Sequence, residues 1–405
     1  MSNNEWRRAA REIFGAGVAA ADPFTGVKAA LQARPVPAGT PIIAVGKAAS
    51  RMAEAALEMV EKPGPLIIVT NPENAREIAG AELFAAAHPV PDKIGLAAGT
   101  AVEALLEAAQ GEVLALISGG GSALLPAPVA GLSLDDKIAV SELLLGSGAE
   151  ITEMNLVRQA LSRLKGGGMA RAAAPAKLRA LILSDVVGDD LRAIASGPTA
   201  EPLGGPAAAR RILEEKGLWG RIPDAVRHYL ETAPEPGPVP PADNALIGSN
   251  GQSVRAMAAA ARAYDMPVHI HAPALTGDVA EAAQRVAMTN DKGIHLFGGE
   301  TTVVLRGNGR GGRNQELALR VGLHLAEQRR PWLYLQAGSD GRDGPTDAAG
   351  GCVDKERMQA MQSAHDLNAL LDNNDAYRAL ESGGALLKTG GTGTNVADLG
   401  VLILG

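Results

Sequence analysis

Glycines, hydroxyl groups and charged side chains gather in short runs directly after apolar, β-branched segments. The segment VLALI (113–117) leads straight into Ser118-Gly119-Gly120-Gly121-Ser122. Three glycines allow left-handed backbone angles and let successive N–H groups approach an anion, and the two serines add hydroxyl donors. A tight turn that only needs flexibility is the alternative interpretation. We predict that this loop binds phosphate.

A lysine occupies the turn after another such segment. PIIAV (41–45) is followed by Gly46 and Lys47. An ammonium group at a strand-to-helix turn can lie near a bound phosphate or carboxylate, although a surface lysine without a function is the alternative. Neither the Walker A spacing nor G-x-G-x-x-G is present at this turn, which argues against a dinucleotide-dependent dehydrogenase.

Three carboxylates follow RALILS (179–184) within six residues, namely Asp185, Asp189 and Asp190. Carboxylates this close repel one another unless a cation lies among them. Hard oxygen ligands favour Mg²⁺, which typically bridges a protein carboxylate and a substrate phosphate. The alternative is a solvated acidic turn.

The second half of the chain has a similar mixture of glycines, acids and a base. Glu300 precedes TTVVL (301–305), and Gly311, Gly312 and Arg313 open a helical pattern. Amides at the start of a helix attract anions, and an arginine adds a bidentate fork. Asp340 follows WLYLQAG (332–338) in a run that resembles a calcium loop in composition but lacks the EF-hand spacing. Further candidate phosphate ligands are Asn250, Thr392, Thr394 and Asn395.

The histidines carry less information. His88, in HPVPD, is a candidate substrate contact, although a loop histidine held by neighbouring prolines is more often structural. His269 and His271 lie two positions apart along a predicted strand. No pair of histidines has the spacing of a metal site.

Composition excludes several classes of function. The chain has 405 residues, 46% hydrophobic and 20% charged, with a net charge of −7 and only 3% aromatic residues, which argues against nucleic acid as a partner. Its single cysteine, Cys352, fits a reducing compartment. The N-terminus lacks a secretory pattern, and no apolar run approaches ~18 residues, so we expect a cytoplasmic protein without a membrane span.

Strand-like and helical segments alternate along the whole chain. Strands at 41–45, 66–70, 113–117 and 179–184, separated by helices at about 47–61, 94–109, 134–146 and 152–164, predict a parallel sheet with helical crossovers. Residues 232–243 contain five prolines and mark a domain boundary. We therefore predict an α/β protein of two lobes with a cleft between them. Residues 1–240 form a Rossmann-like lobe with a parallel sheet, and residues 241–405 form a smaller α/β lobe, with strands at 245–249, 267–272, 301–305, 332–338, 386–390 and 401–404.

Acids, anion-binding loops and a few cations at strand ends together suit phosphoryl transfer. The motifs VGKAA, HPVPD, ISGGGSALL, NLVRQALSRLKGG, LSDVVGDD, GGETTV, GRGGRNQELAL, AGSDGRDGPTD and TGGTGTNVADLG also resemble those of the glycerate 2-kinases with a C-terminal MOFRL domain. That family is sometimes labelled hydroxypyruvate reductase. The resemblance covers about residues 40 to 400, in order, and one departure is Gly391 where a proline is expected.

The resemblance implies ATP- and Mg²⁺-dependent phosphorylation of the 2-hydroxyl of D-glycerate by a monomer or homodimer. It also implies functional roles for Lys47 and Arg313, which we expect to neutralise the glycerate carboxylate or the transferring phosphoryl group. We expect Asp185, Asp189 and Asp340 to include the hydroxyl acceptor and metal ligands, with their order left open and Asp189 as the catalytic candidate. We expect the metal ligands among Asp185, Asp190, Glu300 and Asp340. Two alternatives stay open, an NAD(P)H-dependent hydroxypyruvate reductase and a binding protein without turnover.

Overall fold

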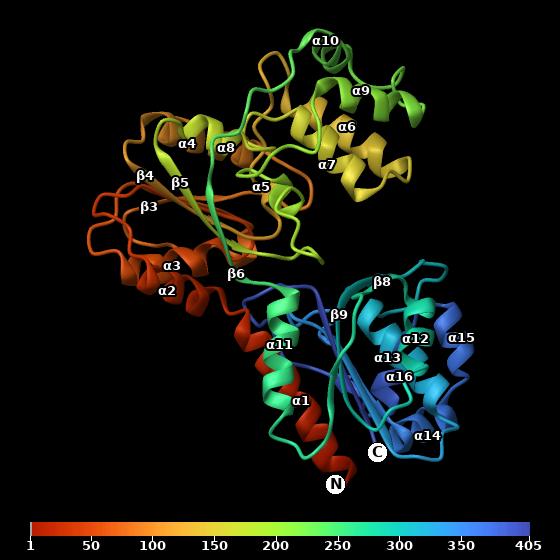
Figure 1. Ribbon diagram of the computed structural model, residues 1–405. Coiled ribbons are helices and arrows are strands. Elements are labelled where there is room, and N and C mark those ends of the chain that lie inside the picture. Colours follow the sequence, from red (N-terminus) through yellow and green to blue (C-terminus); the bar gives the residue numbers. More distant parts are fainter. Residues whose placement is uncertain (1) are drawn as a thin grey trace. The chain divides into compact units, whose positions relative to one another are not determined.

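The computed structural model describes residues 2–405 and divides the chain into two compact units (Figure 1). The parallel-sheet unit comprises residues Pro23–Ser184 and Asp189–Ile247. The mixed-sheet unit comprises the N-terminal segment up to Asp22, the short segment Asp185–Gly188, and Gly248–Gly405. The predicted division at residue 240 was linear along the chain, whereas these units combine segments that are far apart in sequence.

The parallel-sheet unit is built on six strands in the order β3-β2-β1-β4-β5-β6, the order of the dinucleotide-binding Rossmann fold. Neighbouring strands from β3 to β5 pair in parallel, as predicted from the alternation of strands and helices. The six strands are β1 (Ile42–Val45), β2 (Leu66–Thr70), β3 (Ala81–Ala85), β4 (Glu112–Ile117), β5 (Lys177–Leu183) and β6 (Asp243–Gly248).

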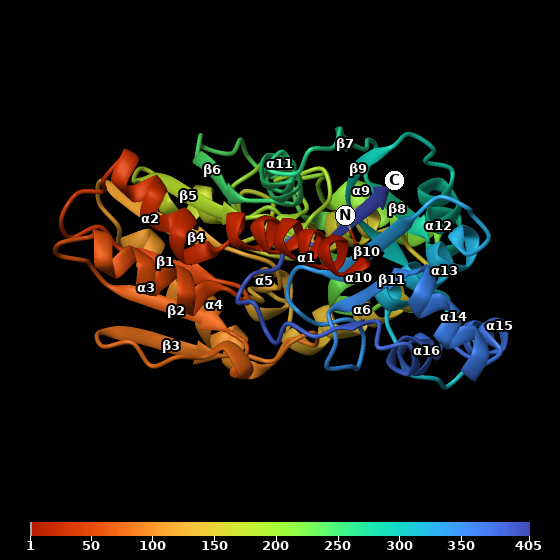
Figure 2. The same cartoon turned by 90° about the horizontal axis from the view of Figure 1, so that it is seen from below.

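Helices cover both faces of this sheet. Helices α2 and α3 pack against one face, and α4 and α8 against the other; Figure 2 shows α2 and α3 lying across the strands. Helices α6, α7, α9 and α10 bury a separate apolar cluster among themselves. The helices of this unit are α2 (Pro23–Ala33), α3 (Ala49–Met59), α4 (Lys93–Ala108), α5 (Gly121–Leu124), α6 (Leu134–Gly146), α7 (Ile151–Ala160), α8 (Gly168–Ala173), α9 (Pro206–Glu215) and α10 (Asp224–Thr232), with 3₁₀ turns at Pro72–Asn74 and Ile194–Ser196.

The mixed-sheet unit has a second sheet in the order β12-β11-β10-β13-β9-β7, with β8 paired to β9. The strands β11, β10, β13 and β9 pair antiparallel, whereas β7 and β8 run parallel to β9. The strands are β7 (Val268–Ile270), β8 (Leu275–Asp278), β9 (Gly293–Thr302), β10 (Trp332–Gly338), β11 (Gly350–Asp354), β12 (Leu386–Leu387) and β13 (Asp398–Leu404). The fold prediction of two α/β parts, one with a parallel sheet, is confirmed.

Helices from both ends of the chain cover the second sheet. The N-terminal helix α1 (Asn3–Ala20) runs beside α11 (Asn250–Ala261) on one face, where they bury one apolar core (Figure 1). The other face buries a second core under the remaining helices. These are α12 (Val279–Ala287), α13 (Arg313–Leu325), α14 (Lys355–Ala364), α15 (Leu367–Asp372) and α16 (Ala376–Ser382).

Several predicted elements differ from the structure. The strand expected at 301–305 is wrong, because β9 spans Gly293–Thr302 and so contains Gly298, Gly299 and Glu300. The strand at 245–249 exists but joins the first sheet as β6. No helix among residues 2–405 is long and apolar enough to span a membrane.

Candidate active site

The turn that carries Lys47 lies directly beside the glycine-rich loop. The parallel pairing of β1 and β4 brings the ends of both strands together, and the Lys47 amide donates to the Gly119 carbonyl at 2.9 Å. Gly46 has φ +119°, and a Cβ there would lie 2.2 Å from the Ser118 hydroxyl. Only glycine fits this approach, so Gly46 sets the path of the chain into Lys47.

The Lys47 side chain faces the middle of the glycine-rich loop. A Cβ at Gly120 would lie 3.1 Å from Lys47 Cγ and 3.4 Å from His88 Cδ2, so all three residues are neighbours. Burial and the nearby Lys47 charge lower the pKa of His88. Lys47 forms no ion pair within the described part of the chain. No acidic side chain among the described residues therefore neutralises its charge.

The two serines of the loop have different environments. Ser118 is buried, and its hydroxyl accepts a hydrogen bond from the Ala48 amide at 3.0 Å, so it holds the two strand ends together. The Ser122 hydroxyl lies 2.6 Å from the Ser196 hydroxyl, which bonds to Asn155. Hydrogen bonds therefore connect the loop around Ser196 to the glycine-rich loop.

The three predicted acids are divided between the two compact units. Asp185 belongs to the mixed-sheet unit, whereas Asp189 and Asp190 belong to the parallel-sheet unit. Arg192 holds Asp190 through both carboxylate oxygens and, mainly by these hydrogen bonds, lowers its pKa. Asp189 has φ +57°, and its Oδ1 atom is buried without a hydrogen-bond partner among the described residues. Asp189 is therefore the acid in this segment that most clearly lacks a cation or donor.

Arg313 lies at the centre of a charged cluster in the mixed-sheet unit. Its Nε and Nη2 atoms donate to the two oxygens of Asp398 at 2.7 and 3.1 Å, and Nη1 lies 2.8 Å from Glu300. Burial lowers the pKa of Arg313, but the Asp398 hydrogen bonds and charge outweigh it, so the net direction is upward. Asp398 pairs in the sheet with Gly299 and Gly338, which places the cluster at the start of the internal strand β13.

A second buried acid occupies the start of α13. Asp343 accepts hydrogen bonds from the Asn314 and Gln315 amides at 3.1 and 2.8 Å. Burial raises the pKa of Asp343 to about 6. Gly312 is needed here because a Cβ would lie 2.3 Å from the Asp343 carboxyl group. An internal carboxylate thus occupies the helix start at which the sequence predicted phosphate binding by Gly311 and Gly312.

The other predicted ligands of this unit make internal contacts. The Asn250 side chain donates to the carbonyls of Val396 and Asp398, and the Thr394 hydroxyl donates to the Ala21 carbonyl. The remaining three are also engaged: Thr392 bonds to the Ser339 carbonyl at 2.6 Å, Asn395 caps the Ala397 amide, and Asp340 accepts from the Arg342 amide. Asp340, Thr392 and Asn395 therefore lie in neighbouring turns close to Ser339.

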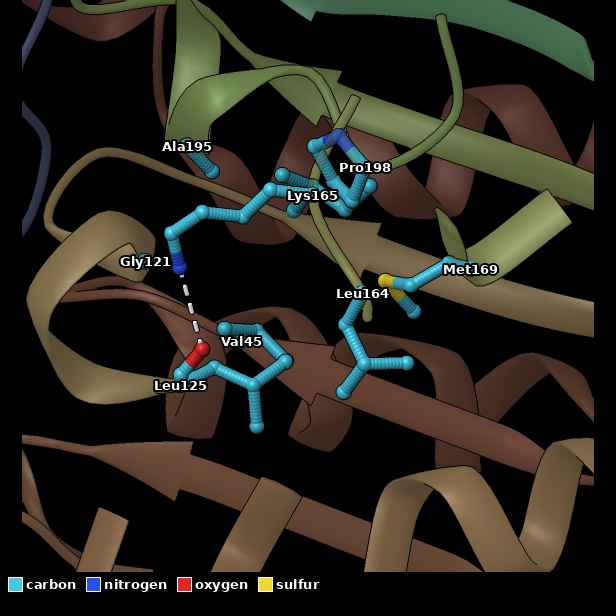
Figure 3. Close-up of a pocket in the computed structure, with 9 residues that line it drawn as sticks. Val45, Gly121, Leu125, Leu164, Lys165, Met169, Ala195 and Pro198 are labelled. Carbon is cyan, nitrogen blue, oxygen red and sulfur yellow. Dashed lines mark hydrogen bonds between the residues drawn. The ribbon is translucent and has the colours of Figure 1, made fainter. Parts of the chain in front are cut away.

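A cationic pocket in the parallel-sheet unit contains residues to which the sequence reading had given no role. It is lined by His88, Gly120 and Ser122 together with Lys137, Arg158 and Lys165. The Lys165 ammonium donates to the Leu125 carbonyl at 3.1 Å, close to the apolar side chains of Val45, Leu164 and Met169 (Figure 3). Burial, and then the neighbouring Arg158 charge, lower the pKa of Lys165 to about 7.

Sequence reasoning missed these cations and the two buried acids. Lys137, Arg158 and Lys165 lie on or after helical segments, where a basic residue is usually solvated. Asp343 lies against Gly312, where no Cβ would fit, and Asp398 is buried in β13 between its sheet partners Gly299 and Gly338. The available signals were the apolar neighbours of Lys165 in LSRLKGGGM and of Asp398 in NVADLGVLIL.

No group of three or more His, Cys, Asp or Glu side chains in residues 2–405 is arranged to hold a metal ion by itself. Mg²⁺ at kinase sites commonly takes one or two carboxylates and completes its shell with water and phosphate oxygens. The unpartnered Oδ1 of Asp189 is compatible with that mode of binding.

Comparison with known proteins agrees with these features. Residues 9–231 match a family described as a domain of unknown function, DUF4147, and residues 293–398 match the MOFRL family. The chain is 35% identical to a glycerate 2-kinase of Pyrococcus horikoshii, over 97% of this chain and 96% of that protein. It is also 38% identical to a putative hydroxypyruvate reductase of Agrobacterium vitis, over 98% and 94% of the two chains.

A solved structure extends the likeness to the fold. The crystal structure of glycerate kinase from Thermotoga maritima matches with a TM-score of 0.93 at 36% identity, over 99% of this chain and 100% of that one. The resemblance seen in the motifs is thereby confirmed, and the chain belongs to the glycerate 2-kinase family with a MOFRL domain.

Proposed function

We propose that the chain transfers the γ-phosphoryl group of ATP to the 2-hydroxyl of D-glycerate, giving ADP and 2-phosphoglycerate. Similarity to glycerate kinases over nearly the whole chain carries this proposal. In the reaction the 2-hydroxyl oxygen bonds to the γ-phosphorus, the bond to the β–γ bridging oxygen breaks, and the hydroxyl proton passes to an acceptor.

Lys47 and the loop from Ser118 to Ser122 suit the phosphate end of this reaction. The lysine has no ion-pair partner among the described residues, and it adjoins a loop whose glycines keep side chains away from bound oxygens. Arg313 uses three of its N–H groups on Asp398 and Glu300, which leaves others for a carboxylate or phosphoryl oxygen. That both sets of residues act on one substrate pair, in a cleft between the domains, is part of the proposal.

The acids provide the proton acceptor and the metal ligands of the proposal. Asp189 has a buried, unpartnered oxygen that suits the acceptor hydroxyl or Mg²⁺. When bound, Mg²⁺ neutralises charge on the β- and γ-phosphates. Among the predicted ligands, Asp190 and Glu300 are ion-paired with Arg192 and Arg313, whereas Asp340 has no ion pair within residues 2–405. Asp185 completes the proposed set.

One assay tests the reaction directly. The purified chain is incubated with D-glycerate and Mg-ATP, ADP release is followed, and the product is resolved as 2- or 3-phosphoglycerate. We expect ADP release that depends on D-glycerate and Mg²⁺, with 2-phosphoglycerate as product. The variant Lys47→Met is expected to lose most of this activity, whereas Lys62→Met, at an exposed position, serves as the matched control. Absence of glycerate-dependent ADP release would overturn the proposal.

A second arm tests the reductase alternative suggested by the name of the Agrobacterium vitis relative. The turn after β1 reads Gly46-Lys47-Ala48-Ala49 and lacks the glycine spacing that binds a dinucleotide pyrophosphate. We therefore expect no loss of nicotinamide absorbance with hydroxypyruvate and NADH or NADPH.

A further inference from the structure

The pocket of the parallel-sheet unit presents three basic side chains that have no acidic partner. Lys137, Arg158 and Lys165 form no ion pair with any carboxylate in residues 2–405. Lys137 and Lys165 are 9% and 4% exposed. The Lys137 ammonium donates to the carbonyls of Leu161 and Arg158 at 2.8 and 3.5 Å, and the Lys165 ammonium donates to the Leu125 carbonyl at 3.1 Å.

Such a cluster is unfavourable without a counter-ion. A buried charge that lacks an opposite charge destabilises the folded state, and like charges add to the effect. Burial lowers the pKa of Lys137 and, to a smaller extent, of Arg158, and the positive charges of Lys165 and Arg158 lower the pKa of Lys137 further. In contrast, Arg313 is balanced by Asp398 and Glu300. An anionic ligand is the simplest partner for the unbalanced cluster.

The rest of the lining indicates where that anion comes from. Gly120 and Ser122 bring the glycine-rich loop to the pocket, and Gly120 also adjoins Lys47. Exposed apolar side chains, Val90 at 53% and Leu145 at 63%, lie at its rim. The basic part of the lining is therefore continuous with the loop at which we place phosphoryl transfer, and this further inference rests on that proposed function.

We propose that Lys137, Arg158 and Lys165 bind an oxyanion of a kinase substrate, either the carboxylate of D-glycerate or the phosphates of the nucleotide. His88 and Glu142 are the other titratable groups of the lining, and Glu142 forms no ion pair with the three basic groups within residues 2–405. The bound oxyanion supplies the counter-charge of these three groups. It also favours the protonated form of Lys165, whose ammonium then has an anionic as well as a carbonyl partner. Binding should therefore be accompanied by proton uptake, and affinity should fall as pH rises above about 7.

Titration calorimetry on the full chain tests this, with D-glycerate, ADP and inorganic pyrophosphate each added alone. The variants are Lys165→Met and Arg158→Met, and Lys177→Met, at the exposed start of β5, is the matched control. We expect both pocket variants to weaken binding of D-glycerate, or of ADP and pyrophosphate, at least tenfold, while the control binds as the wild type does. The ligand whose binding is weakened identifies the oxyanion.

The pH dependence of affinity and the proton uptake on binding distinguish a ligand-binding role of Lys165 from a purely structural one. Wild-type affinity for the affected ligand should fall between pH 6.5 and 8.5, and repeating the titration in buffers of different ionisation enthalpy should reveal proton uptake. Lys165→Met should lose both effects. If Lys165→Met does not fold, Arg158→Met and the wild-type proton uptake decide the matter. Unchanged affinities in the variants, or binding of every ligand without proton uptake in the wild type, would overturn the inference. Because pyrophosphate and ADP binding need no turnover, failure of the glycerate kinase assay alone leaves this result readable.

Discussion

The charges around Arg313 differ from those around Lys47, and this difference assigns the two residues different tasks. The Arg313 guanidinium is held by a buried carboxylate and by Glu300, so its orientation is fixed before any ligand binds. Lys47 has a flexible stem and no acidic partner among the described residues. Under the proposed function, Arg313 would act as a preorganised fork, whereas the Lys47 ammonium would follow the transferring phosphoryl group.

Replacing Arg313 by Lys should lower kcat/KM at least tenfold, which corresponds to about 1.4 kcal/mol. A lysine keeps the positive charge but cannot bond Asp398 through two nitrogens and Glu300 through a third. Steady-state kinetics with D-glycerate measures the effect. Arg320→Lys, farther along α13 and paired with Glu316, is the matched control and should stay close to wild type. Near-normal turnover of the Arg313 variant would contradict the role given to the fork.

Asp343 should give the protein a pH-dependent stability. Its folded pKa of about 6 lies above its ordinary value of 3.8, because the carboxyl group is buried. Between these values the folded state binds more protons than the unfolded state, so this contribution to stability falls as pH rises and is lost above about 6. The free energy of unfolding of the wild type, minus that of Asp343→Asn, should therefore fall by up to about 3 kcal/mol from pH 4 to pH 7.

Denaturant titrations at several pH values measure this difference. Asp340→Asn is the matched control, since Asp340 lies three residues away and is partly exposed. A difference between wild type and Asp343→Asn that does not change with pH would show that Asp343 keeps its charge throughout this range.

At the scale of elements, the close approach of β1 and β4 decides the shape of the phosphate loop. Gly46→Ala should destabilise the parallel-sheet unit, because the added methyl group would meet the Ser118 hydroxyl and backbone at a left-handed φ. We expect a loss of about 2 kcal/mol or more and a marked loss of activity. Thermal unfolding measures it. Gly220→Ala, where a Cβ has open space and φ is not left-handed, should change stability little.

The sequence predicted those strands whose pattern lies within one short stretch of the chain. Strands β1, β2, β4 and β10 appear as predicted, since each is a continuous apolar run bounded by turn residues. In contrast, β3 (AELFA) and β11 (GGCVD) contain polar or glycine residues and owe their strand form to pairing with β2 and β10. The antiparallel pairing in the second sheet likewise depends on long-range contacts that no local pattern contains.

The candidate site shows the same limit. The glycine-rich loop and Lys47 were predictable, because glycines before a helix and a lysine at a strand end have a local meaning. Asp398 was not, since its role comes from pairing with Gly299 and Gly338 and from the distant Arg313. The sequence predicted phosphate binding at the start of α13 and did not foresee Asp343. This residue is 29 positions from Asn314, and its carboxylate already accepts hydrogen bonds from the first amides of the helix.

At the scale of the whole molecule, the compact units do not follow the order of the chain. Helix α1 stands at the N-terminus, yet it packs within the mixed-sheet unit, where Trp6, Ile13 and Phe14 join a core with strands β10 and β13. Burying these three side chains contributes roughly 6 kcal/mol. The stability of the C-terminal strands therefore depends on residues more than two hundred positions away.

Ile13→Ala tests this dependence. The fully buried side chain leaves a cavity when shortened, so we expect a loss of about 2–5 kcal/mol. Hydrogen exchange should rise in β10 and β13, which share the core with α1, and stay unchanged in β1, β4 and β5. Gly15→Ala is the matched control on the same helix, because a Cβ there meets nothing within 4 Å and alanine favours the helix. Increased exchange confined to β1, β4 and β5 would instead place α1 with the first sheet, as the linear division at residue 240 implies.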